Sequence, residues 1–560
     1  MEESDKTLKK SHRAIDLYSG VGGWSFGLRL AGIDVVASYE IWGPANETNF
    51  KNNAHQAQTV DIRRLSLDDL PSDIDIVVGS PPCTQFSYSN RGGSGDVADG
   101  LEDIKKFLTI VDHLKPTHWA MENVPRVAKI IEAELESGGE LHRFRHLGCE
   151  THIVDMAAFG LPQRRKRCIA GNFSFERLNS FKKRMTAKTL GDVLQALGTD
   201  PVVDPLYGVE LPRDELTEHH KEDVLSDEEA RINRANKTTH HIYNSMPFPD
   251  PLDRSVRTIT ATCTRVSRES VVVRSGDEGD QFRRLTLRER ASLQGFPITF
   301  QFYGTSYGQK LRMIGNAVPP AFTYLMGKVL VGTGAEEPVD LCKAAVGVSQ
   351  PGPKPPATPP DKVGSQYPEG RTFRFAIPSL RLKSGVRFEF RNQKQQDLTK
   401  WQIQFYFGTS KEILDLQLND DLKKLLLAGM SNTLGEVVKE TISEIERYTK
   451  TVDFRNMQSV WSHRGPAGTR PFTYLDMLDE EGKALVARVE PHIDEATDLV
   501  NLALEDSYGA SFLQLPGIKK LQRNAPLILS GLLIGASLNP IIDRRTSQQL
   551  GESPLSSRVS

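Results

Sequence analysis

The chain has 560 residues, which at roughly 150 residues per domain predicts three or four folding units rather than a single core. Hydrophobic residues make up 38% and charged residues 25%, a globular composition that excludes a wholly disordered or collagen-like protein. The formal net charge is −2, so a site for a polyanion must be local. Five cysteines without CxxC spacing argue against a disulfide framework or structural zinc and favour a reducing cytosol. The charged first ten residues do not read as a secretory signal.

From residue 13 to residue 171, short apolar runs alternate with helical patterns. The runs AIDLYS, DVVASY, IDIVVGS, HWAMENV and THIVDMAAF predict strands. Between them, WSFGLRLAG and residues 101–114 have the apolar spacing of helices. This alternation predicts an α/β doubly wound sheet.

The remaining chain divides into three parts. Residues 173–250 are polar and weakly periodic, which predicts a loop-rich module, and regular patterns return at VRTITATC and LTLRERASLQGF. The segment PGPKPPATPP, residues 351–360, has six prolines and predicts a linker that lets a further domain act semi-independently. Beyond it, FRFAIPSLRLKSGVRFEF alternates as strands do, and the segments around 411–449 and 472–505 are helical in pattern. A smaller α+β domain is expected there.

The most apolar run is APLILSGLLIGASL near the C-terminus. Asn539 and Pro540 are expected to close it short of the 18 or more residues of a membrane span. We therefore expect a buried core helix and no membrane partner.

The segment DLYSGVGG, residues 16–23, predicts a strand that runs into a glycine turn and then a helix. Gly20, Gly22 and Gly23 permit a tight turn and close approach of a ligand, and Glu40 ends the next strand, where a carboxylate suits ribose hydroxyls. The full GxGxxG fingerprint is missing, which disfavours a dinucleotide and favours a nucleoside cofactor without a pyrophosphate. A purely structural glycine turn is equally consistent with these residues.

The segment GSPPCTQFS, residues 79–87, directly follows an apolar strand. Two prolines stiffen the backbone before Cys83 and place its thiol at the carboxyl end of the strand, the edge where open α/β sheets bind ligands. A lone cysteine is more often simply buried, but the polar, glycine-rich stretch that follows argues for a surface loop. We expect Cys83 to be a nucleophile.

Two further motifs point to the same sheet edge. Glu122 in MENV ends another strand, and Gln163, Arg165 and Arg167 in QRRKR would project to one face of an extended segment. A capping carboxylate and a solvated basic run are their structural alternatives. Together with the thiol, they supply a carboxyl group for a base edge and guanidinium groups for an anion or phosphate.

These motifs resemble, in order and wording, those of the cytosine carbon-5 DNA methyltransferases. The resemblance covers roughly residues 13–330 and is specific, because independent motifs occur in the family's order. It implies a Rossmann-like doubly wound sheet with an inserted loop-rich target-recognition module. The motifs that carry it are DLYSGVGGWSFGL, YEIW, VDIR, GSPPCTQFS, MENV, QRRKR, LTLRERASLQGFP and GNAVPP.

The domain organisation that follows has four parts. Residues 11–172 and 311–332 would form the catalytic, cofactor-binding domain, and residues 173–310 the target-recognition domain. Residues 346–366 would form the Pro-rich linker, and residues 371–560 an accessory domain to which the resemblance gives no role. Specificity for the target sequence is expected in residues 173–250, which carry no legible base code.

The resemblance also implies the chemistry. Cys83 would add to carbon-6 of cytosine, Glu122 would act at ring nitrogen-3, and Arg165 with Arg167 would hold the base and lower the thiol pKa. The cofactor would be S-adenosylmethionine, held by Asp16, Tyr18, Gly20, Gly22, Gly23, Glu40, Ile41, Trp42, Asp61, Ile62, Pro81 and Asn316. The DNA would be contacted by Gln85, Ser87, Arg91 and Gln163, with residues 84–99 closing over a flipped base.

One departure leaves a question open. Family members often place an aromatic residue directly after the acid, whereas here Ile41 follows Glu40 and Trp42 comes next. The sequence does not decide which of the two side chains packs on the adenine.

The expected partner is double-stranded DNA, bound by a monomer. A cognate restriction endonuclease that shares the target site would be a second partner, unless the methylase acts without one. The expected location is the bacterial cytoplasm, at the nucleoid while acting. An RNA cytosine-5 methyltransferase and a non-catalytic DNA-binding relative are the alternatives, and the intact Cys83, Glu122 and Arg165 argue against the second.

Four weaker signals have competing interpretations. His219, His220, His240 and His241 could hold a metal, but polar loop histidines are favoured and no metal is expected. Asp479 with Glu481 and Lys483 faintly resembles a nuclease metal site, against which a solvated amphipathic helix is favoured. Phosphate contact and a solvated helix face are equally consistent with Arg283, Arg284, Arg288 and Arg290. A nucleic-acid or partner surface and a sheet with one apolar face are equally consistent with Arg371, Phe373, Arg374, Phe375, Arg387, Phe388 and Arg391.

Overall fold

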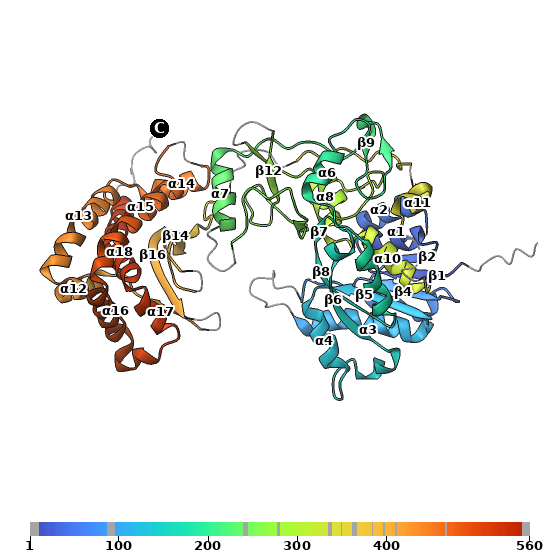
Figure 1. Cartoon of the computed structure of the whole chain (residues 1–560), viewed down its shortest axis with the longest axis horizontal. Coiled ribbons are helices and arrows are strands. Elements are labelled where there is room, and N and C mark those ends of the chain that lie inside the picture. Colours follow the sequence, from blue (N-terminus) through green and yellow to red (C-terminus); the bar gives the residue numbers. More distant parts are fainter. Residues whose placement is uncertain are drawn as a thin grey trace, which may run out of the picture. The chain divides into compact units, whose positions relative to one another are not determined.

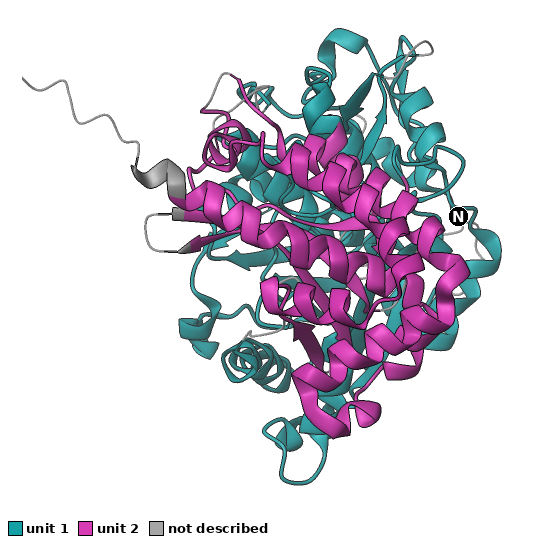
Figure 2. Cartoon of the chain, turned by 90° about the vertical axis from the view of Figure 1, so that its left-hand side faces the viewer, with its two compact units in different colours: residues 1–230, 248–361 teal, residues 231–247, 362–560 magenta. Residues whose placement is uncertain are grey.

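The structure is a computed structural model of the chain. It describes residues 11–55, 57–86, 96–238, 245–276, 281–333, 339–348, 350–360, 367–382, 385–395, 398–408, 412–464 and 467–551. The chain forms two units, which Figure 2 distinguishes by colour. The N-terminal unit comprises Met1–Ala230 and Phe248–Asp361, and the C-terminal unit comprises Arg231–Pro247 and Lys362–Ser560. The C-terminal unit thus includes a segment from within residues 173–310.

The N-terminal unit is built on a seven-stranded sheet with the strand order β3-β2-β1-β4-β5-β8-β6 (Figure 1). The strands from β3 to β5 pair in parallel, and β8 runs antiparallel to both β5 and β6. Their bounds are β1 (Arg13–Leu17), β2 (Asp34–Glu40), β3 (Ala57–Thr59), β4 (Ile76–Gly79), β5 (His118–Asn123), β6 (Glu150–Asp155) and β8 (Lys166–Gly171). The α/β doubly wound prediction is confirmed. Sequence patterning missed β3, which has three residues, and β8, which begins within a basic run.

Both faces of this sheet are buried, because successive side chains of a strand point to opposite faces. In β1, Ala14 belongs to one core cluster, and Ile15 and Leu17 belong to the other. Helices α1 (Gly23–Leu30) and α10 (Pro320–Leu330) contribute to the first cluster, and α3 (Val97–Leu114) and α4 (Arg126–Leu135) to the second. The sheet is therefore the rigid middle layer from which the loops at its edge project.

Helix α10 comes from the far end of the N-terminal unit and packs directly on α1. A Cβ on Gly27 of α1 would lie 2.0 Å from Thr323 Oγ1, and one on Gly23 would lie 2.1 Å from the Val318 carbonyl oxygen. Glycine at both positions lets the two backbones approach this closely. The contact brings the segment around Asn316 to the turn that follows β1.

Residues 163–164, just before β8, and the residues between β8 and α10 form short elements around a loop-rich core. The helices are α5 (Phe175–Ser180), α6 (Leu190–Ala196), α7 (Asp227–Thr238), α8 (Leu287–Leu293) and α9 (Tyr307–Asn316). The short strands, which pair as β10-β9, β11-β7 and β12-β13, are β7 (Gln163–Arg164), β9 (Val202–Val203), β10 (Glu210–Leu211), β11 (Val256–Arg257), β12 (Val272–Arg274) and β13 (Phe282–Arg284).

Both interpretations of Arg283, Arg284, Arg288 and Arg290 were wrong, because all four side chains are buried. Arg284 Nε donates to Glu222 Oε2 at 2.6 Å, and Arg283 Nη1 donates to Glu289 Oε2 at 2.8 Å. The guanidinium of Arg288 donates to the carbonyl oxygens of Thr217, Pro297 and Phe300. These arginines hold the loops of this region together instead of meeting solvent or phosphate.

The first half of the predicted linker contacts the N-terminal unit. Tyr303 Oη donates to the Pro353 carbonyl at 2.6 Å, and Lys310 Nζ donates to the Pro356 carbonyl at 2.8 Å. Lys354 Nζ donates to the Asp214 carbonyl at 3.0 Å. Residues 350–360 have neither helix nor strand, yet they are fastened to the unit and are not a free tether; residues 361–366 lie outside the described residues.

The C-terminal unit has the predicted α+β composition. Its antiparallel sheet has the order β14-β15-β16-β17, with β14 (Arg374–Arg381), β15 (Arg387–Gln395), β16 (Leu398–Gly408) and β17 (Ile413–Leu416). Its helices are α12 (Asp420–Gly429), α13 (Asn432–Thr449), α14 (Phe454–Trp461), α15 (Pro471–Val489), α16 (Ile493–Tyr508), α17 (Ile518–Arg523) and α18 (Ala525–Gly551). The segment 411–449 is not helical from its start, because β17 precedes α12. Asp479 of α15 accepts the Ser379 amide, which ties the helix to β14.

The expectation that Pro540 ends the apolar C-terminal helix was wrong, because α18 continues through it to Gly551. Asn539 Nδ2 donates to the carbonyl oxygens of Ile403 and Leu418, and Asn539 Oδ1 accepts the Ile403 amide at 2.8 Å. This packing against β16 outweighs the hydrogen bond that proline removes. Among the described residues, Ala525–Ser547 of α18 is long and apolar enough to cross a membrane, but 83% of its most apolar window is buried within the protein, as in a core helix.

Candidate active site

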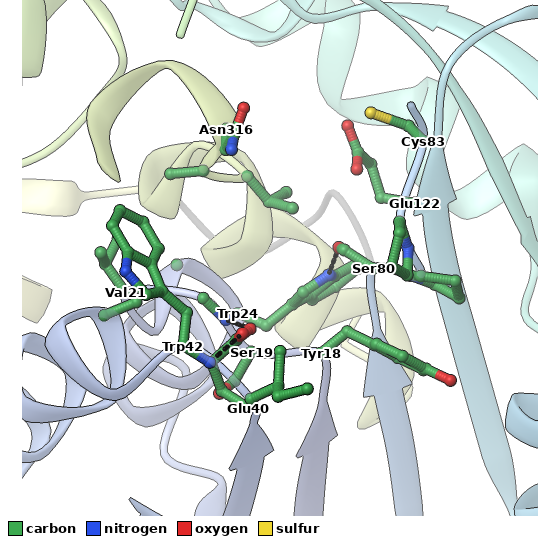
Figure 3. A pocket seen from close by; sticks show the side chains of 18 of the residues that line it. Tyr18, Ser19, Val21, Trp24, Glu40, Trp42, Ser80, Cys83, Glu122 and Asn316 are labelled. Carbon is green, nitrogen blue, oxygen red and sulfur yellow. Dashed lines mark hydrogen bonds between the residues drawn. The ribbon is translucent and has the colours of Figure 1, made fainter. Parts of the chain in front are cut away.

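A cavity of about 520 Å³ lies at the carboxyl ends of β1, β2, β4 and β5 (Figure 3). Its walls come from the loops that follow these strands and from the segment before α10. The sequence-predicted residues that line it are Tyr18, Gly20, Gly23, Glu40, Ile41, Trp42, Asp61, Ile62, Pro81, Cys83, Glu122, Arg165, Arg167 and Asn316. The fold therefore brings fourteen candidates together, and their individual roles stay predictions.

The turn after β1 has a backbone that most residues avoid. Gly22, at the start of α1, has φ 84°, and a Cβ there would lie 2.0 Å from Asn49 Oδ1. Gly20 has φ 53°. Gly22 does not line the cavity; it shapes the turn by letting α1 begin against α2 (Gly43–Asn53).

Glu40 lies at the end of β2 and faces this turn. Its Oε2 accepts the Gly20 amide at 2.9 Å, and its Oε1 accepts the Trp42 amide at 2.8 Å. Burial raises the pKa of Glu40, and these amide hydrogen bonds oppose the rise. Each carboxylate oxygen keeps a further lone pair, so the group is fixed in place and can still accept a hydroxyl from the cavity.

Both Ile41 and Trp42 line the cavity, but in different ways. Ile41 is 66% exposed, whereas Trp42 is half-buried and has the Arg312 guanidinium 5.6 Å from its ring centroid. Figure 3 shows the Trp42 ring along the cavity wall, well away from Cys83. Of the two, Trp42 is the side chain that offers a flat apolar surface along this wall.

Cys83 and Glu122 lie together at the other end of the cavity, where Figure 3 shows the sulfur and the carboxyl group side by side. Two hydrogen bonds fix the loop that carries Cys83. Asn123 Nδ2, next to Glu122 in β5, donates to the Pro81 carbonyl at 3.0 Å, and Trp24 Nε1 donates to Ser80 Oγ at 3.1 Å. The loop that carries the thiol is thus held by one neighbour on β5 and one on α1.

The charges around Cys83 act in opposite directions. Burial, followed by the Glu122 carboxylate, raises the pKa of the Cys83 thiol, while Arg167 and Arg165 lower it. Arg167 Nε lies 2.9 Å from Glu122 Oε1 in a nearly buried ion pair. Because the Glu122 carboxylate contributes to the raised pKa of the thiol, a ligand that engages Glu122 would favour the thiolate.

Arg165 acts on the opposite wall. Its Nη1 and Nη2 donate to the carbonyl oxygens of Gly315 and Ala317 at 3.3 and 3.1 Å. Burial, followed by Arg167, lowers the pKa of Arg165 to about 9. By holding the residues on either side of Asn316, Arg165 positions that side chain, which is exposed and lines the cavity.

Two predicted site residues are placed elsewhere. Asp16 is buried beneath α1, where its Oδ2 accepts the Ser25 amide at 3.1 Å and the Ser25 hydroxyl at 2.6 Å. The prediction of a cofactor contact was wrong, because in β1 this side chain points to the helix and satisfies an amide of its first turn. Gln163 is also buried and joins Gln294 to Ile259, so a contact with DNA does not fit its position.

The other predicted DNA contacts are only partly described. Gln85 Nε2 donates to Asp99 Oδ2 at 3.2 Å, and Gln85 Oε1 accepts the Asp96 amide at 3.0 Å. Gln85 does not line the cavity. Ser87 and Arg91 lie outside the described residues, as does most of the segment 84–99 expected to close over the base.

Sequence reasoning named Tyr18 as a site residue but missed its two polar partners in the cavity wall, Arg63 and Asp103. The Arg63 guanidinium binds both carboxylate oxygens of Asp103, at 2.9 and 2.7 Å, and Tyr18 Oη donates to Asp103 Oδ1 at 3.1 Å. Arg63, Asp103 and Tyr18 all line the cavity. Arg63 directly follows the predicted pair Asp61 and Ile62, which was the one available signal. Asp103, the partner of Arg63, lies 40 residues later, and no sequence signal pointed to it.

A metal site finds no support in the described part of the chain, where no group of three or more His, Cys, Asp or Glu could hold an ion. His219 Nδ1 instead lies 3.2 Å from the Thr286 hydroxyl. His240 and His241 lie outside the described residues.

Comparison with known proteins gives consistent results for the first part of the chain. The family model for C-5 cytosine-specific DNA methylases matches residues 12–331. The type II methyltransferase M.HindV of Haemophilus influenzae is 27% identical over 321 residues, which cover 55% of this chain and 92% of that protein. The type II methyltransferase M1.HphI of Haemophilus parahaemolyticus is 28% identical over 347 residues, which cover 58% and 87%. The crystal structure of the S. pombe Dnmt2 methyltransferase matches with a TM-score of 0.42 and 20% identity, over 57% of this chain and 98% of that one.

Proposed function

The chain belongs to the family of C-5 cytosine-specific DNA methylases, and from this premise we propose that it methylates carbon-5 of a cytosine flipped out of a specific sequence in duplex DNA. The observation that carries the proposal is the shared cavity, with Cys83, Glu122 and Arg167 at one end and Glu40 and Trp42 at the other. A thiol nucleophile and a nucleoside site are thus held within one enclosed volume.

Members of this family use S-adenosylmethionine, and the residues at the Glu40 end fit it. Glu40 has carboxylate lone pairs for two vicinal hydroxyls, Trp42 offers a ring for an adenine, and Asn316 lines the same wall. When bound there, S-adenosylmethionine supplies the electrophilic methyl group that carbon-5 accepts.

The protein's own residues make carbon-5 reactive. As a thiolate, Cys83 Sγ bonds to carbon-6, and the electron pair of the 5,6 double bond becomes available at carbon-5. Glu122 holds the proton at ring nitrogen-3, which withdraws electrons from the ring, and Arg165 and Arg167 stabilise negative charge nearby. Once carbon-5 carries the methyl group, loss of its proton restores the double bond and releases Cys83 as the leaving thiolate.

Target choice would lie outside this cavity. The flipped base is read alone, so its neighbours must be read by other residues, and we assign that role to residues 173–250. The type II names of the relatives support a role in restriction-modification, with a cognate endonuclease or as a solitary methylase acting in a bacterial cytoplasm. We also propose that the protein binds DNA as a monomer.

Methyl transfer from labelled S-adenosylmethionine tests the proposal directly. Wild-type protein should label duplex DNA, and Cys83→Ala should abolish labelling while duplex binding persists, because phosphate contacts do not involve the thiol. Cys342→Ala removes an exposed thiol and is the matched control, expected to be fully active. Labelling of RNA alone, or turnover by Cys83→Ala, would refute it; bisulfite sequencing of DNA from expressing cells then gives the target sequence.

A further inference from the structure

The sheet of the C-terminal unit has two chemically different faces. Helices α12 to α18 gather on one face (Figure 1), where the aromatic side chains Phe375, Phe388, Phe390, Trp401 and Phe405 are buried. The alternate residues of the same strands point the other way. This second face, the polar sheet face, consists of Arg374 and Ala376 of β14, Arg387, Glu389, Arg391 and Gln393 of β15, and Lys400, Gln402, Gln404 and Tyr406 of β16.

Charge is divided unevenly between the layers of this unit. Residues 371–408, which include the three long strands, contain eight Lys and Arg against two Asp and Glu. Residues 411–551, which include the helices, contain 16 Lys and Arg against 20 Asp and Glu. The chain as a whole is nearly neutral, so the positive charge of the sheet is a local feature that a polyanion would meet.

The arginines of the polar sheet face crowd around a single carboxylate. Arg374 Nε and Arg387 Nε donate to the two oxygens of Glu389, at 2.6 and 2.5 Å. Arg391 Nη1 donates only to neutral groups, Gln404 Oε1 and the Tyr406 hydroxyl. Lys400 Nζ is paired with Asp543 Oδ2 of α18 at 3.1 Å. The four cationic side chains of this face, Arg374, Arg387, Arg391 and Lys400, therefore meet two carboxylates, which leaves a surplus of positive charge.

The strand register places like charges directly opposite each other. Arg374 pairs with Arg391 across β14 and β15, and such like-charge pairs destabilise a sheet. None of the large exposed apolar side chains among the described residues lies on β14, β15 or β16, which argues against an apolar partner. A face that keeps repelling charges at a cost in stability is typical of a binding surface.

We propose that the polar sheet face binds the phosphate backbone of duplex DNA without reading its sequence. This rests on the proposed function, because the substrate of the same chain then supplies the polyanion. Guanidinium groups present planar donors that match phosphate oxygens, and Tyr406 with the glutamines adds neutral donors. Phosphate contacts position a protein and add salt-dependent affinity, while base contacts specify the site. The C-terminal unit would thus raise affinity for DNA without altering the target sequence.

Charge removal on the full-length protein tests this face. The triple variant Arg374→Gln, Arg391→Gln, Lys400→Gln removes three positive charges from it. The matched control Lys424→Gln, Lys439→Gln, Arg447→Gln removes the same charge from exposed positions on α12 and α13. Anisotropy of a labelled duplex without methyl donor should show about tenfold weaker binding by the first triple only. Its slope of log K against log salt should fall by about two to three units, because each lost phosphate contact removes about 0.9.

Several outcomes would overturn the inference. Equal affinities of the two triples would do so, as would stronger binding of the wild-type face to single-stranded RNA than to duplex DNA in competition. Because Arg374 contacts a buried carboxylate, the variant Arg374→Lys, Arg391→Lys, Lys400→Arg keeps the charge and should lose much less affinity than the first triple, although lysine lacks the planar donors of arginine. A loss there equal to that of the first triple would mean that folding, and not charge, had been measured. The readout is independent of methyl transfer, so an inactive protein that still loses affinity in the first triple would refute the proposed function and leave this inference intact.

Discussion

Two arginine-rich segments of the N-terminal unit occupy different environments. In residues 163–167, Arg165 and Arg167 line the cavity with Cys83 and act on Glu122 and on the backbone around Asn316. In residues 283–290, the arginines are buried against carboxylates and carbonyls, and none of them lines that cavity. The difference lies in their partners, since Glu222 stands 62 residues before Arg284. Arginines of the first segment should matter for chemistry, and those of the second for stability.

The largest effect is expected from breaking a buried pair of the second segment. Arg284→Met leaves the fully buried Glu222 without its main counter-charge, which should lower the free energy of unfolding by about 3–5 kcal/mol. Chemical denaturation of the wild type and the variant measures this loss in the free energy of unfolding. Arg164→Met, at a side chain 66% exposed, is the control and should cost less than about 1 kcal/mol. A loss below 1 kcal/mol for Arg284→Met would contradict the structural role.

The first segment is tested through Glu122, which Arg167 neutralises. Glu122→Gln should slow methyl transfer by about 10² to 10³-fold, because a positioned proton donor is lost, and should leave cofactor binding within about twofold. The same change should speed alkylation of Cys83 by iodoacetamide without DNA. Glu122 raises the pKa of the thiol, so its removal increases the thiolate fraction at neutral pH.

Arg167→Gln should change the rate of Cys83 alkylation in the opposite direction. Arg167 lowers the pKa of Cys83, so its loss should slow alkylation of that thiol, followed by peptide mapping because other free cysteines are present. If both variants shifted alkylation in the same direction, the electrostatic description of this end of the cavity would be wrong.

The sequence predicted five of the seven strands of the sheet and fourteen of the cavity residues, because most of those residues lie at or after the carboxyl ends of strands that share one edge. It failed where a side chain's partner is distant. Nothing local distinguishes Arg284 from Arg167, and alternation along β1 did not show that Asp16 would meet Ser25 instead of the cavity. Pro540 was misjudged for a similar reason, since the packing of Asn539 on β16 is a long-range contact.

Arg63 shares features of both arginine-rich segments, because it forms ion pairs, as Arg284 does, and also lines the cavity, as Arg167 does. Its side chain is 38% exposed, so Arg63→Ala should change stability by less than about 1 kcal/mol. It should raise the KM for S-adenosylmethionine about tenfold, because Asp103 and Tyr18 lose the group that orients them, while kcat changes little. Arg64→Ala, at a neighbour 87% exposed, is the control. An equal fall in kcat would mean that Arg63 acts on the reacting groups.

The last prediction concerns the pH dependence of stability at Asp16, a predicted cavity residue that is buried beneath α1. Burial raises the pKa of Asp16 to about 7 from an ordinary value of 3.8. Stability from the protonated carboxyl is fully present below about pH 4 and is lost as pH rises through about 7, because the folded state then holds a buried charge. Asp16→Asn can still accept both Ser25 hydrogen bonds and does not ionise. The unfolding free energy of wild type relative to Asp16→Asn should therefore fall between about pH 4 and 7, by at most about 1.4 kcal/mol per pH unit. A flat difference together with a raised KM for the cofactor would return Asp16 to the cavity.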